Sequence, residues 1–331
     1  MKKAFLALAC ILTLAGCTDS DDKDKQQVKD NQQVTAQIDV TATDTLDVNG
    51  YISRARLNLA NQRVGDAIRD INSALSLDSK NIDALLVLAD IYYALGDQDN
   101  ILLTLNKATE IAPLDSRPII KLSELSFLQG NPQMANAYLD KALELNSMNP
   151  QAYYMRGIIF MSKNDTVQAL KQFMKARNQD DSFIDPVLQL ASIYAAQRNP
   201  MARDFYNLAI EMEPENYGSY YDLAMYLQDN GYPEKALEIY DTLDAKFPGN
   251  YQVLFNKGYV NLVYLFEYDD AISYFDKALE VDPKSIDALL NKGVAYEQKG
   301  NYMKAKSIYL QVLKDNPNYQ LAIDALQRIG E

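Results

Sequence analysis

The chain has 331 residues, of which 48% are hydrophobic and 23% charged, so it can bury a substantial core. It contains no histidine, which excludes histidine-based acid–base catalysis, histidine-activated nucleophiles and histidine-containing zinc or haem sites. The formal net charge of −13 opposes binding to phosphate backbones, so we expect no nucleic acid partner.

The first 17 residues predict a bacterial lipoprotein signal. Residues 1–3 carry two lysines, and residues 4–15 form an apolar run that is too short to span a bilayer as a helix. Residues 14–17 (Leu-Ala-Gly-Cys) resemble a lipobox, in which the signal is cut before the cysteine and that cysteine carries the lipid. The resemblance implies a signal peptide over residues 1–16 and lipidation of Cys17. The alternative is an ordinary signal peptide with an incidental cysteine.

Residues 17–47 are expected to form the lipidated cysteine and a flexible acidic tether. Residues 18–47 contain eight Asp, three Lys and no aromatic residue, a composition that cannot bury enough apolar surface to order itself. Residues 20–24 (Ser-Asp-Asp-Lys-Asp) resemble the acidic export tags of Bacteroidota surface lipoproteins, although a solvated linker explains them equally well. By the sorting logic of Gram-negative lipoproteins, Thr18 implies the outer membrane, on its periplasmic face or at the cell surface.

From residue 48 onward, one sequence pattern recurs with a period of 34 residues. A small or aliphatic residue leads each copy, a bulky apolar residue follows four positions later, and a small or aliphatic residue comes three positions after that. This spacing places all three on one face of a helix. The leading residues are separated by 34, 34, 34, 33, 34, 35 and 34 positions, and they are Ala67, Ile101, Ala135, Ala169, Ala202, Ala236, Ala271 and Ala305.

A second amphipathic helix precedes each leading residue, and it carries one small residue where two helices must approach closely. These small residues are Ala55, Ala89, Ser123, Gly157, Ala191, Ala224, Gly258 and Gly293. Glycines stand where four of these helices must stop, because glycine adopts the left-handed conformation without a Cβ penalty; they are Gly96, Gly130, Gly231 and Gly300. Prolines are expected to end the second helices, at Pro113, Pro214, Pro248, Pro283 and Pro317.

The pattern resembles the tetratricopeptide repeat, although the tryptophan usual in its first slot is absent throughout. The resemblance implies an all-α solenoid, a right-handed superhelix of about eight helix–turn–helix units with a C-terminal capping helix over residues 320–331. Repeat five is one residue short before Ala202, and repeat seven has one extra residue between Gly258 and Ala271. The expected units fill residues 48–319, at 48–81, 82–115, 116–149, 150–183, 184–216, 217–250, 251–285 and 286–319.

In this family the first helices line a concave groove that binds peptides. Carried over to this chain, the expected partner-binding residues are Tyr93, Phe127, Tyr154, Met155, Ile158, Tyr221, Met225, Phe255, Asn256, Tyr259 and Asn291. Each of them is as readily explained as core between repeats, but Tyr154, Tyr221 and Tyr259 are expected to reach solvent. Asn256 and Asn291 occupy the asparagine slots of a carboxylate clamp, yet the cations that such a clamp needs are missing, so no clamp is expected.

We expect no enzyme, no cofactor and no metal site. Residues 97–100 (Asp-Gln-Asp-Asn) lack the glycine and the terminal glutamate of a calcium loop and are predicted to form a turn with a helix N-cap. The leading hypothesis is a lipid-anchored adaptor that binds peptide segments of other envelope proteins in its groove and assembles them at the membrane. A groove that is acidic at one end and apolar in the middle favours partners with basic and apolar segments. The alternatives are an accessory subunit of an outer-membrane assembly or secretion machine, and a glycan-capture lipoprotein.

Overall fold

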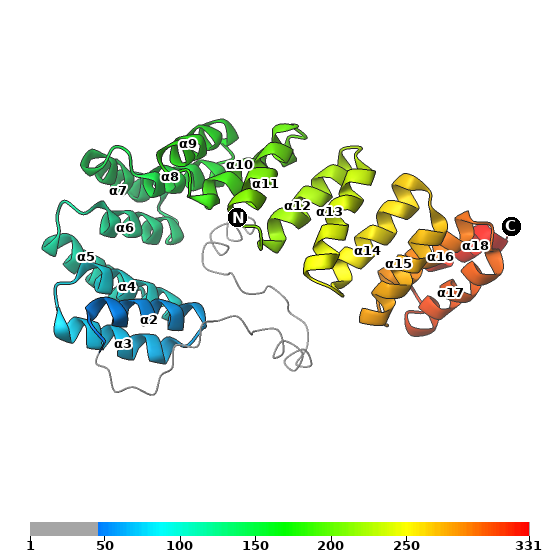
Figure 1. The fold of residues 1–331 in the computed structure, drawn as a ribbon, viewed down its shortest axis with the longest axis horizontal. Coiled ribbons are helices and arrows are strands. Elements are labelled where there is room, and N and C mark those ends of the chain that lie inside the picture. The colour runs from blue at the N-terminus through cyan, green and yellow to red at the C-terminus, as the bar shows by residue number, and fades with distance from the viewer. Residues whose placement is uncertain (1–45, 331) are drawn as a thin grey trace. The chain divides into compact units, whose positions relative to one another are not determined.

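The computed structural model describes residues 46–330 (Figure 1), and the expected signal peptide, Cys17 and almost all of the tether lie outside this part. All regular secondary structure in the described part is helical, which confirms the predicted fold class. The described residues fall into two compact units, one ending at Gln179 and the other beginning at Asp180. The period of the repeat did not indicate this division, because it continues through residue 180 without interruption.

The first unit contains four antiparallel helix pairs, coloured blue to green in Figure 1. The pairs are α2 (Val48–Ala60) with α3 (Val64–Leu77), α4 (Ile82–Leu95) with α5 (Gln98–Ile111), α6 (Ser116–Leu128) with α7 (Pro132–Leu145), and α8 (Pro150–Ser162) with α9 (Thr166–Gln179).

The second unit contains four further pairs and one additional helix. The pairs are α10 (Ile184–Ala196) with α11 (Met201–Met212), α12 (Tyr217–Asp229) with α13 (Pro233–Lys246), α14 (Tyr251–Val260) and its π-helical continuation η2 (Asn261–Leu265) with α15 (Tyr268–Val281), and α16 (Ile286–Gln298) with α17 (Tyr302–Asp315). The additional helix α18 (Gln320–Gly330) packs its Ala322 and Ala325 into the last apolar cluster, which confirms the predicted capping helix.

Local sequence signals set the helix boundaries. The five prolines named above each stand two residues beyond the last residue of a second helix, as predicted. Asp97 caps α5, as predicted, because its carboxylate accepts a hydrogen bond from the backbone N–H of Asn100 at 3.2 Å. Asn, Asp and Ser side chains cap most of the first helices in the same way, at Asp47, Asn81, Asp115, Asn149, Asn216, Asn250 and Ser285.

Every turn within a helix pair contains one residue in the left-handed conformation. The four glycines predicted there have φ between 72° and 84°, which confirms their role. The other four turns use residues that carry a Cβ atom, with φ between 53° and 61°, and these residues are Gln62, Asn164, Arg198 and Phe266. The left-handed turn is therefore formed even where the sequence has no glycine, the residue that adopts this conformation with the least strain.

The predicted close approach within each pair is present. A Cβ atom added to Gly157 would lie 2.5 Å from the Phe173 ring, and one added to Gly293 would lie 2.5 Å from the Tyr309 ring. Both rings are fully buried. The glycines are thus required by a ring that fills the space of a side chain, not by the backbone conformation of their helices.

The two irregular repeats accommodate their changes in different places. In repeat five the missing residue lies between Arg198 and Ala202, so α11 has 12 residues where the other second helices have 14. In repeat seven the extra residue lies before Phe266, and the first helix absorbs it by widening into η2. In repeat seven the small residue keeps its contact with the bulky one, since a Cβ atom added to Gly258 would lie 2.8 Å from the Phe275 ring.

Candidate protein-interaction site

Five aromatic rings lie along the first helices of the second unit, and we call them the aromatic ladder: Tyr217 and Tyr221 of α12, and Tyr251, Phe255 and Tyr259 of α14. Their spacing of four residues puts successive rings of one helix on the same face. The stacked pairs have ring centroids 5.7 Å apart for Tyr217 and Tyr221, 5.9 Å for Tyr251 and Phe255, and 6.4 Å for Phe255 and Tyr259. All five rings are partly exposed.

Polar contacts fix the orientation of the ladder. Asn256 donates from Nδ2 to the hydroxyl of Tyr221 at 3.0 Å and so joins α14 to α12. The Tyr251 hydroxyl lies 2.5 Å from the hydroxyl of Ser285 at the start of α16. Burial raises the pKa of Tyr217 to about 12, so this phenol is neutral at physiological pH. Hydrogen bonds therefore hold the Tyr221 and Tyr251 rings in place.

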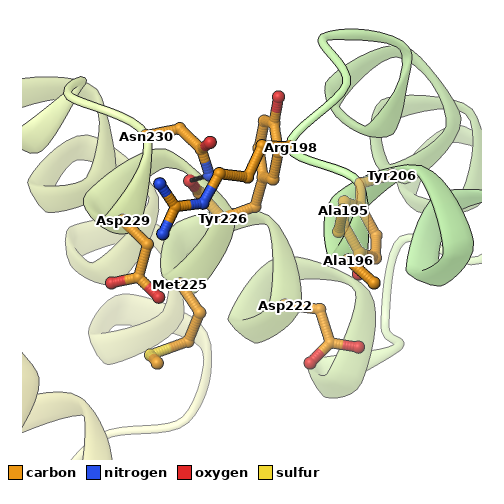
Figure 2. Close-up of a pocket in the computed structure, with 9 residues that line it drawn as sticks. All are labelled: Ala195, Ala196, Arg198, Tyr206, Asp222, Met225, Tyr226, Asp229 and Asn230. Carbon is orange, nitrogen blue, oxygen red and sulfur yellow. Dashed lines mark hydrogen bonds between the residues drawn. The ribbon is translucent and has the colours of Figure 1, made fainter.

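A cavity of about 280 Å³ lies next to the ladder, where α10, α11 and α12 meet (Figure 2). Its lining includes both acidic and apolar side chains, and we call it the α12 pocket; the lining residues are Ala195, Ala196, Arg198, Tyr206, Asp222, Met225, Tyr226, Asp229 and Asn230. Partial desolvation in the pocket raises the pKa of Asp222 above its usual value, although the side chain is still open to solvent. Burial also raises the pKa of Tyr206, and the carboxylate of Asp222 adds to that shift.

The first helices of the first unit carry charges instead of stacked rings. Arg117 of α6 donates from Nη1 to the carboxylate of Asp83 on α4 at 2.6 Å. Lys121 of α6 forms an ion pair with Asp90 of α4. Burial works to lower the pKa of Lys121, but the carboxylates of Asp90 and Glu124 outweigh it and keep this lysine charged. We call these five residues the charged face.

Three of the expected groove residues are buried in the first unit. Tyr154, Met155 and Ile158 of α8 have exposed fractions of 5%, 1% and 3%, so the expectation that Tyr154 reaches solvent is wrong. The Tyr154 ring packs against Phe173 of α9, with centroids 5.7 Å apart. Tyr93 and Phe127 are half-buried, and Tyr93 packs against the apolar cluster of α4, α5 and α6.

The expected residues of the second unit lie closer together and are more accessible. Tyr221, Met225, Phe255 and Tyr259 are partly exposed along α12 and α14. Asn256 is 9% exposed, and its side-chain amide donates a hydrogen bond to the Tyr221 hydroxyl of the ladder. Asn291 of α16 lies apart from this group, and its amide donates to the backbone carbonyl of Asp287 on its own helix.

Three aromatic residues near the site were not anticipated, namely Tyr217, Tyr251 and Tyr264. The first two stand one helical turn before Tyr221 and Phe255, so extending the same four-residue spacing toward the helix start would have found them. Tyr264 lies in η2 and donates to the carboxylate of Asp229 at 3.5 Å. No sequence rule for a regular helix places it there.

Within residues 46–330, no group of three or more acidic, cysteine or histidine side chains is arranged to hold a metal ion. Among the same residues, no helix is both long enough and apolar enough to cross a bilayer.

Similar sequences occur in an archaeal protein and in a human protein. The chain is 25% identical over 194 residues to a TPR repeat-containing protein of Methanocaldococcus jannaschii, a match that covers 59% of this chain and 30% of that protein. It is 21% identical over 313 residues to the human mitochondrial import receptor subunit TOM70, with 89% of this chain and 48% of TOM70 covered. The chain thus spans less than half the length of either relative.

A solved structure has the same fold. It is the C-terminal part of a TPR repeat-containing protein from Cytophaga hutchinsonii, which is 18% identical with a TM-score of 0.53 and covers 83% of this chain and 99% of that one. Sequence models of the tetratricopeptide repeat match residues 52–116, 128–182 and 263–329, together 187 of the 331 residues. With helix pairs, turns and small-to-large contacts in the register of this repeat, the chain belongs to the tetratricopeptide repeat family.

Proposed function

We propose that the chain is a protein-binding adaptor and that the aromatic ladder holds a peptide segment of its partner. Tetratricopeptide repeat proteins in general mediate protein–protein interactions, and the family therefore supports a binding role. The observation that carries the proposal is the ladder itself. Five partly exposed rings, stacked along two helices and with the hydroxyls of Tyr221 and Tyr251 held by hydrogen bonds, offer a large amphipathic surface that needs little further ordering when a partner binds.

The proposed place of action is the cell envelope, with the chain anchored by lipid on Cys17. The support is the sequence of residues 1–17, whose basic, apolar and Leu-Ala-Gly-Cys segments follow one another as in lipoprotein signals. The partners would then be segments of other envelope proteins, assembled at the outer membrane. The match to TOM70, named as a receptor subunit for mitochondrial import, is consistent with a partner-binding role at a membrane.

Affinity capture from native envelopes tests the binding surface. The full chain is compared with the double variant Tyr221→Ala/Tyr259→Ala and with the control Tyr302→Ala, which removes an exposed tyrosine outside the ladder. We expect the double variant to lose at least tenfold in partner recovery, because buried tyrosines are frequent binding hot spots. The control should recover partners as the wild type does, and melting curves should show that all three chains fold. Equal recovery by the double variant would remove the ladder from the site.

Cross-linking in the native envelope, followed by mass spectrometry, separates an adaptor from a dedicated subunit of a machine. A varied set of partners in less than equal amounts supports the adaptor. One β-barrel protein recovered in equal amount would support the accessory subunit instead.

Cell fractionation tests the anchor. We expect Cys17→Ser to move the chain out of the membrane fraction, because no other attachment is predicted. Retention of this variant in the membrane fraction would refute anchoring through Cys17.

A further inference from the structure

We propose that the α12 pocket selects the partner of this chain by binding one basic side chain, a lysine or an arginine, of the peptide that the aromatic ladder holds. The proposal rests on the proposed function and adds to it the chemistry that decides which peptide is accepted. It is carried by the geometry of the pocket, by the charges of its lining and by its continuity with the ladder.

The pocket lies where the repeat departs from its period. Repeat five lacks one residue between Arg198 and Ala202, and the shortened turn borders the pocket through Arg198. The Tyr226 hydroxyl of α12 donates to the backbone carbonyl of Asn199 in this turn at 3.0 Å. The other irregular segment, η2, reaches the same helix through the bond from Tyr264 to Asp229. Residues of both irregular segments therefore form hydrogen bonds with α12.

The charges of the lining favour a cation. Two carboxylates, Asp222 and Asp229, and one guanidinium, that of Arg198, leave the lining with a net charge of −1. Arg198 extends toward Asp229 and Asn230, at the far end of the pocket from Asp222 (Figure 2). Asp229 also receives contacts from Tyr264 and from the Gln228 amide, whereas Asp222 has no hydrogen bond or ion pair within the described residues. A basic group of the partner would compensate the charge of Asp222.

The size and spacing of the groups fit a side chain and not a metal ion. Asp222 and Asp229 are seven residues apart on α12, which is roughly 10 Å along a helix, so both cannot bind one ion directly. The cavity of about 280 Å³ is at the lower limit of sites that enclose whole small molecules. Met225 and Tyr206 contribute apolar atoms to the lining, and such atoms suit the methylene stem of a lysine or an arginine.

The pocket is continuous with the ladder. Tyr221 of the ladder directly precedes Asp222, and Asn256 contacts both Tyr221 and the sulfur of Met225, at 3.0 Å and 3.6 Å. A peptide lying on the rings of α12 and α14 would therefore pass the opening of the pocket. One basic residue next to apolar or aromatic residues is the sequence feature that the two surfaces together would accept.

A double-mutant cycle with selected peptides tests the pocket. Peptides of twelve residues are selected from a random phage-displayed library on the full chain, and the tightest is synthesised with its basic residue intact or replaced by glutamine. Each form is titrated against wild type, Asp222→Asn, Tyr259→Ala and Asp315→Asn. The last variant removes one negative charge at the exposed end of α17, outside the pocket, and so controls for the net charge of the chain.

We expect a lysine or arginine at one fixed position of the selected peptides. Replacing it with glutamine should weaken binding to wild type about tenfold and leave binding to Asp222→Asn nearly unchanged. Asp315→Asn should behave as wild type. The pocket proposal would be overturned if the selected peptides had no fixed basic residue, or if Asp222→Asn and Asp315→Asn bound the basic peptide with equal affinity. In either case, weaker peptide binding by Tyr259→Ala would still support the ladder as the binding surface. Selection of no peptide at all would overturn the proposed function and the pocket with it.

Discussion

The two units of this chain use the same repeat to build different surfaces. In the first unit, four of the five side chains of the charged face are paired across neighbouring helices, since Asp83 contacts Arg117 and Asp90 contacts Lys121. In the second unit, the corresponding helices carry stacked rings and a pocket in which Asp222 has no counter-charge among residues 46–330. A surface whose charges are mostly paired has less to gain from a charged partner. A surface with an unpaired carboxylate beside exposed rings can bind both a basic group and an apolar group of a partner.

The comparison separates what all repeats must share from what each is free to change. The positions that face the second helix of a pair are fixed by packing, so they are small in every repeat. The positions of the ladder and of the charged face are only partly covered by the core, and they differ between the units. Five predictions test this separation, beginning with the shared core.

The largest effects are expected where a glycine admits a ring. Gly157→Ala in the first unit and Gly293→Ala in the second should each lower the free energy of unfolding by about 1–3 kcal/mol, because the new Cβ meets the ring of Phe173 or Tyr309. Gly65→Ala is the matched control, since its Cβ would meet no atom within 4 Å, and it should gain up to about 1 kcal/mol. Urea denaturation measures all three. Unchanged midpoints for the first two variants would refute the shared packing.

The next effects concern a buried carboxylate near each end of the described chain. Asp70 of α3 accepts hydrogen bonds from Arg54 and Asn58, and Glu297 of α16 accepts them from Arg328 and Tyr309. Asp70→Asn and Glu297→Gln should each cost about 1–3 kcal/mol at pH 7, because a charged hydrogen-bond acceptor is lost while its donors remain. Similar losses in urea denaturation would show that the two units protect their outer repeats in the same way.

Glu297 also predicts a pH dependence. The guanidinium of Arg328 holds the pKa of Glu297 below its usual value of 4.5, the Tyr309 hydroxyl contributes in the same direction, and burial opposes both. The stabilisation is therefore complete above the unfolded value and decreases as the pH falls through the lower folded value. The difference between wild type and Glu297→Gln should become smaller below pH 4.5. A difference that stays constant down to pH 3 would contradict this assignment.

Smaller effects are expected at the left-handed turns. Gln62→Gly in the first unit and Phe266→Gly in the second should each raise the free energy of unfolding by about 0.5–1 kcal/mol, because both residues are exposed and have positive φ. Gly231→Ala is the converse variant and should lower it by about 1–2 kcal/mol. Thermal melting of the three variants gives the comparison. A loss of stability in Phe266→Gly would show that its exposed ring contributes more than its strained backbone costs.

The smallest effects have opposite signs in the two units. Asp90→Asn removes the partner of Lys121 and should cost up to about 1 kcal/mol, whereas Asp222→Asn removes an unpaired charge that solvent screens and should raise stability only slightly at pH 7. Because burial raises the pKa of Asp222, the charged form costs stability at neutral pH, and this cost disappears as the pH falls toward the unfolded value of 3.8. Stability measured at pH 7 and pH 4 tests this. If both variants changed the free energy of unfolding in the same direction at pH 7, the two units would not differ in how their carboxylates are paired.

The regular part of the fold was predictable in detail. The 34-residue period identifies the helix pairs, the prolines mark where second helices end, and glycine marks four of the eight left-handed turns. Gln62, Arg198 and Phe266 gave no such signal, because side chains of these types rarely adopt this conformation. The neighbouring helices impose it on them through the spacing of the buried residues on either side.

The site was predictable only in part, because a first helix is packed on more than one side. The same pattern that named Tyr221 and Tyr259 also named Tyr154, which is buried against Phe173. Periodicity locates a side chain around the axis of its helix, but the exposure of that side chain depends on the size of the residues on the next helices. The α12 pocket depends in the same way on one missing residue in repeat five and on the direction that Arg198 takes there.

The sequence by itself determined the repeat, its register, its family and the residues that must be small or bulky, since these follow from contacts along one helix or between consecutive helices. It did not determine where the extra residue of repeat seven would lie, because a longer turn and a widened helix have the same sequence. In the tertiary structure the helix widens into η2 and the turn keeps its length. Gly258 of α14 keeps its contact with Phe275, and Asn261 and Leu262 of η2 are buried. Tertiary packing alone also decided which carboxylates gain a counter-charge from a distant helix, as Asp83, Asp90 and Glu297 do from cations about 30 residues away in the sequence.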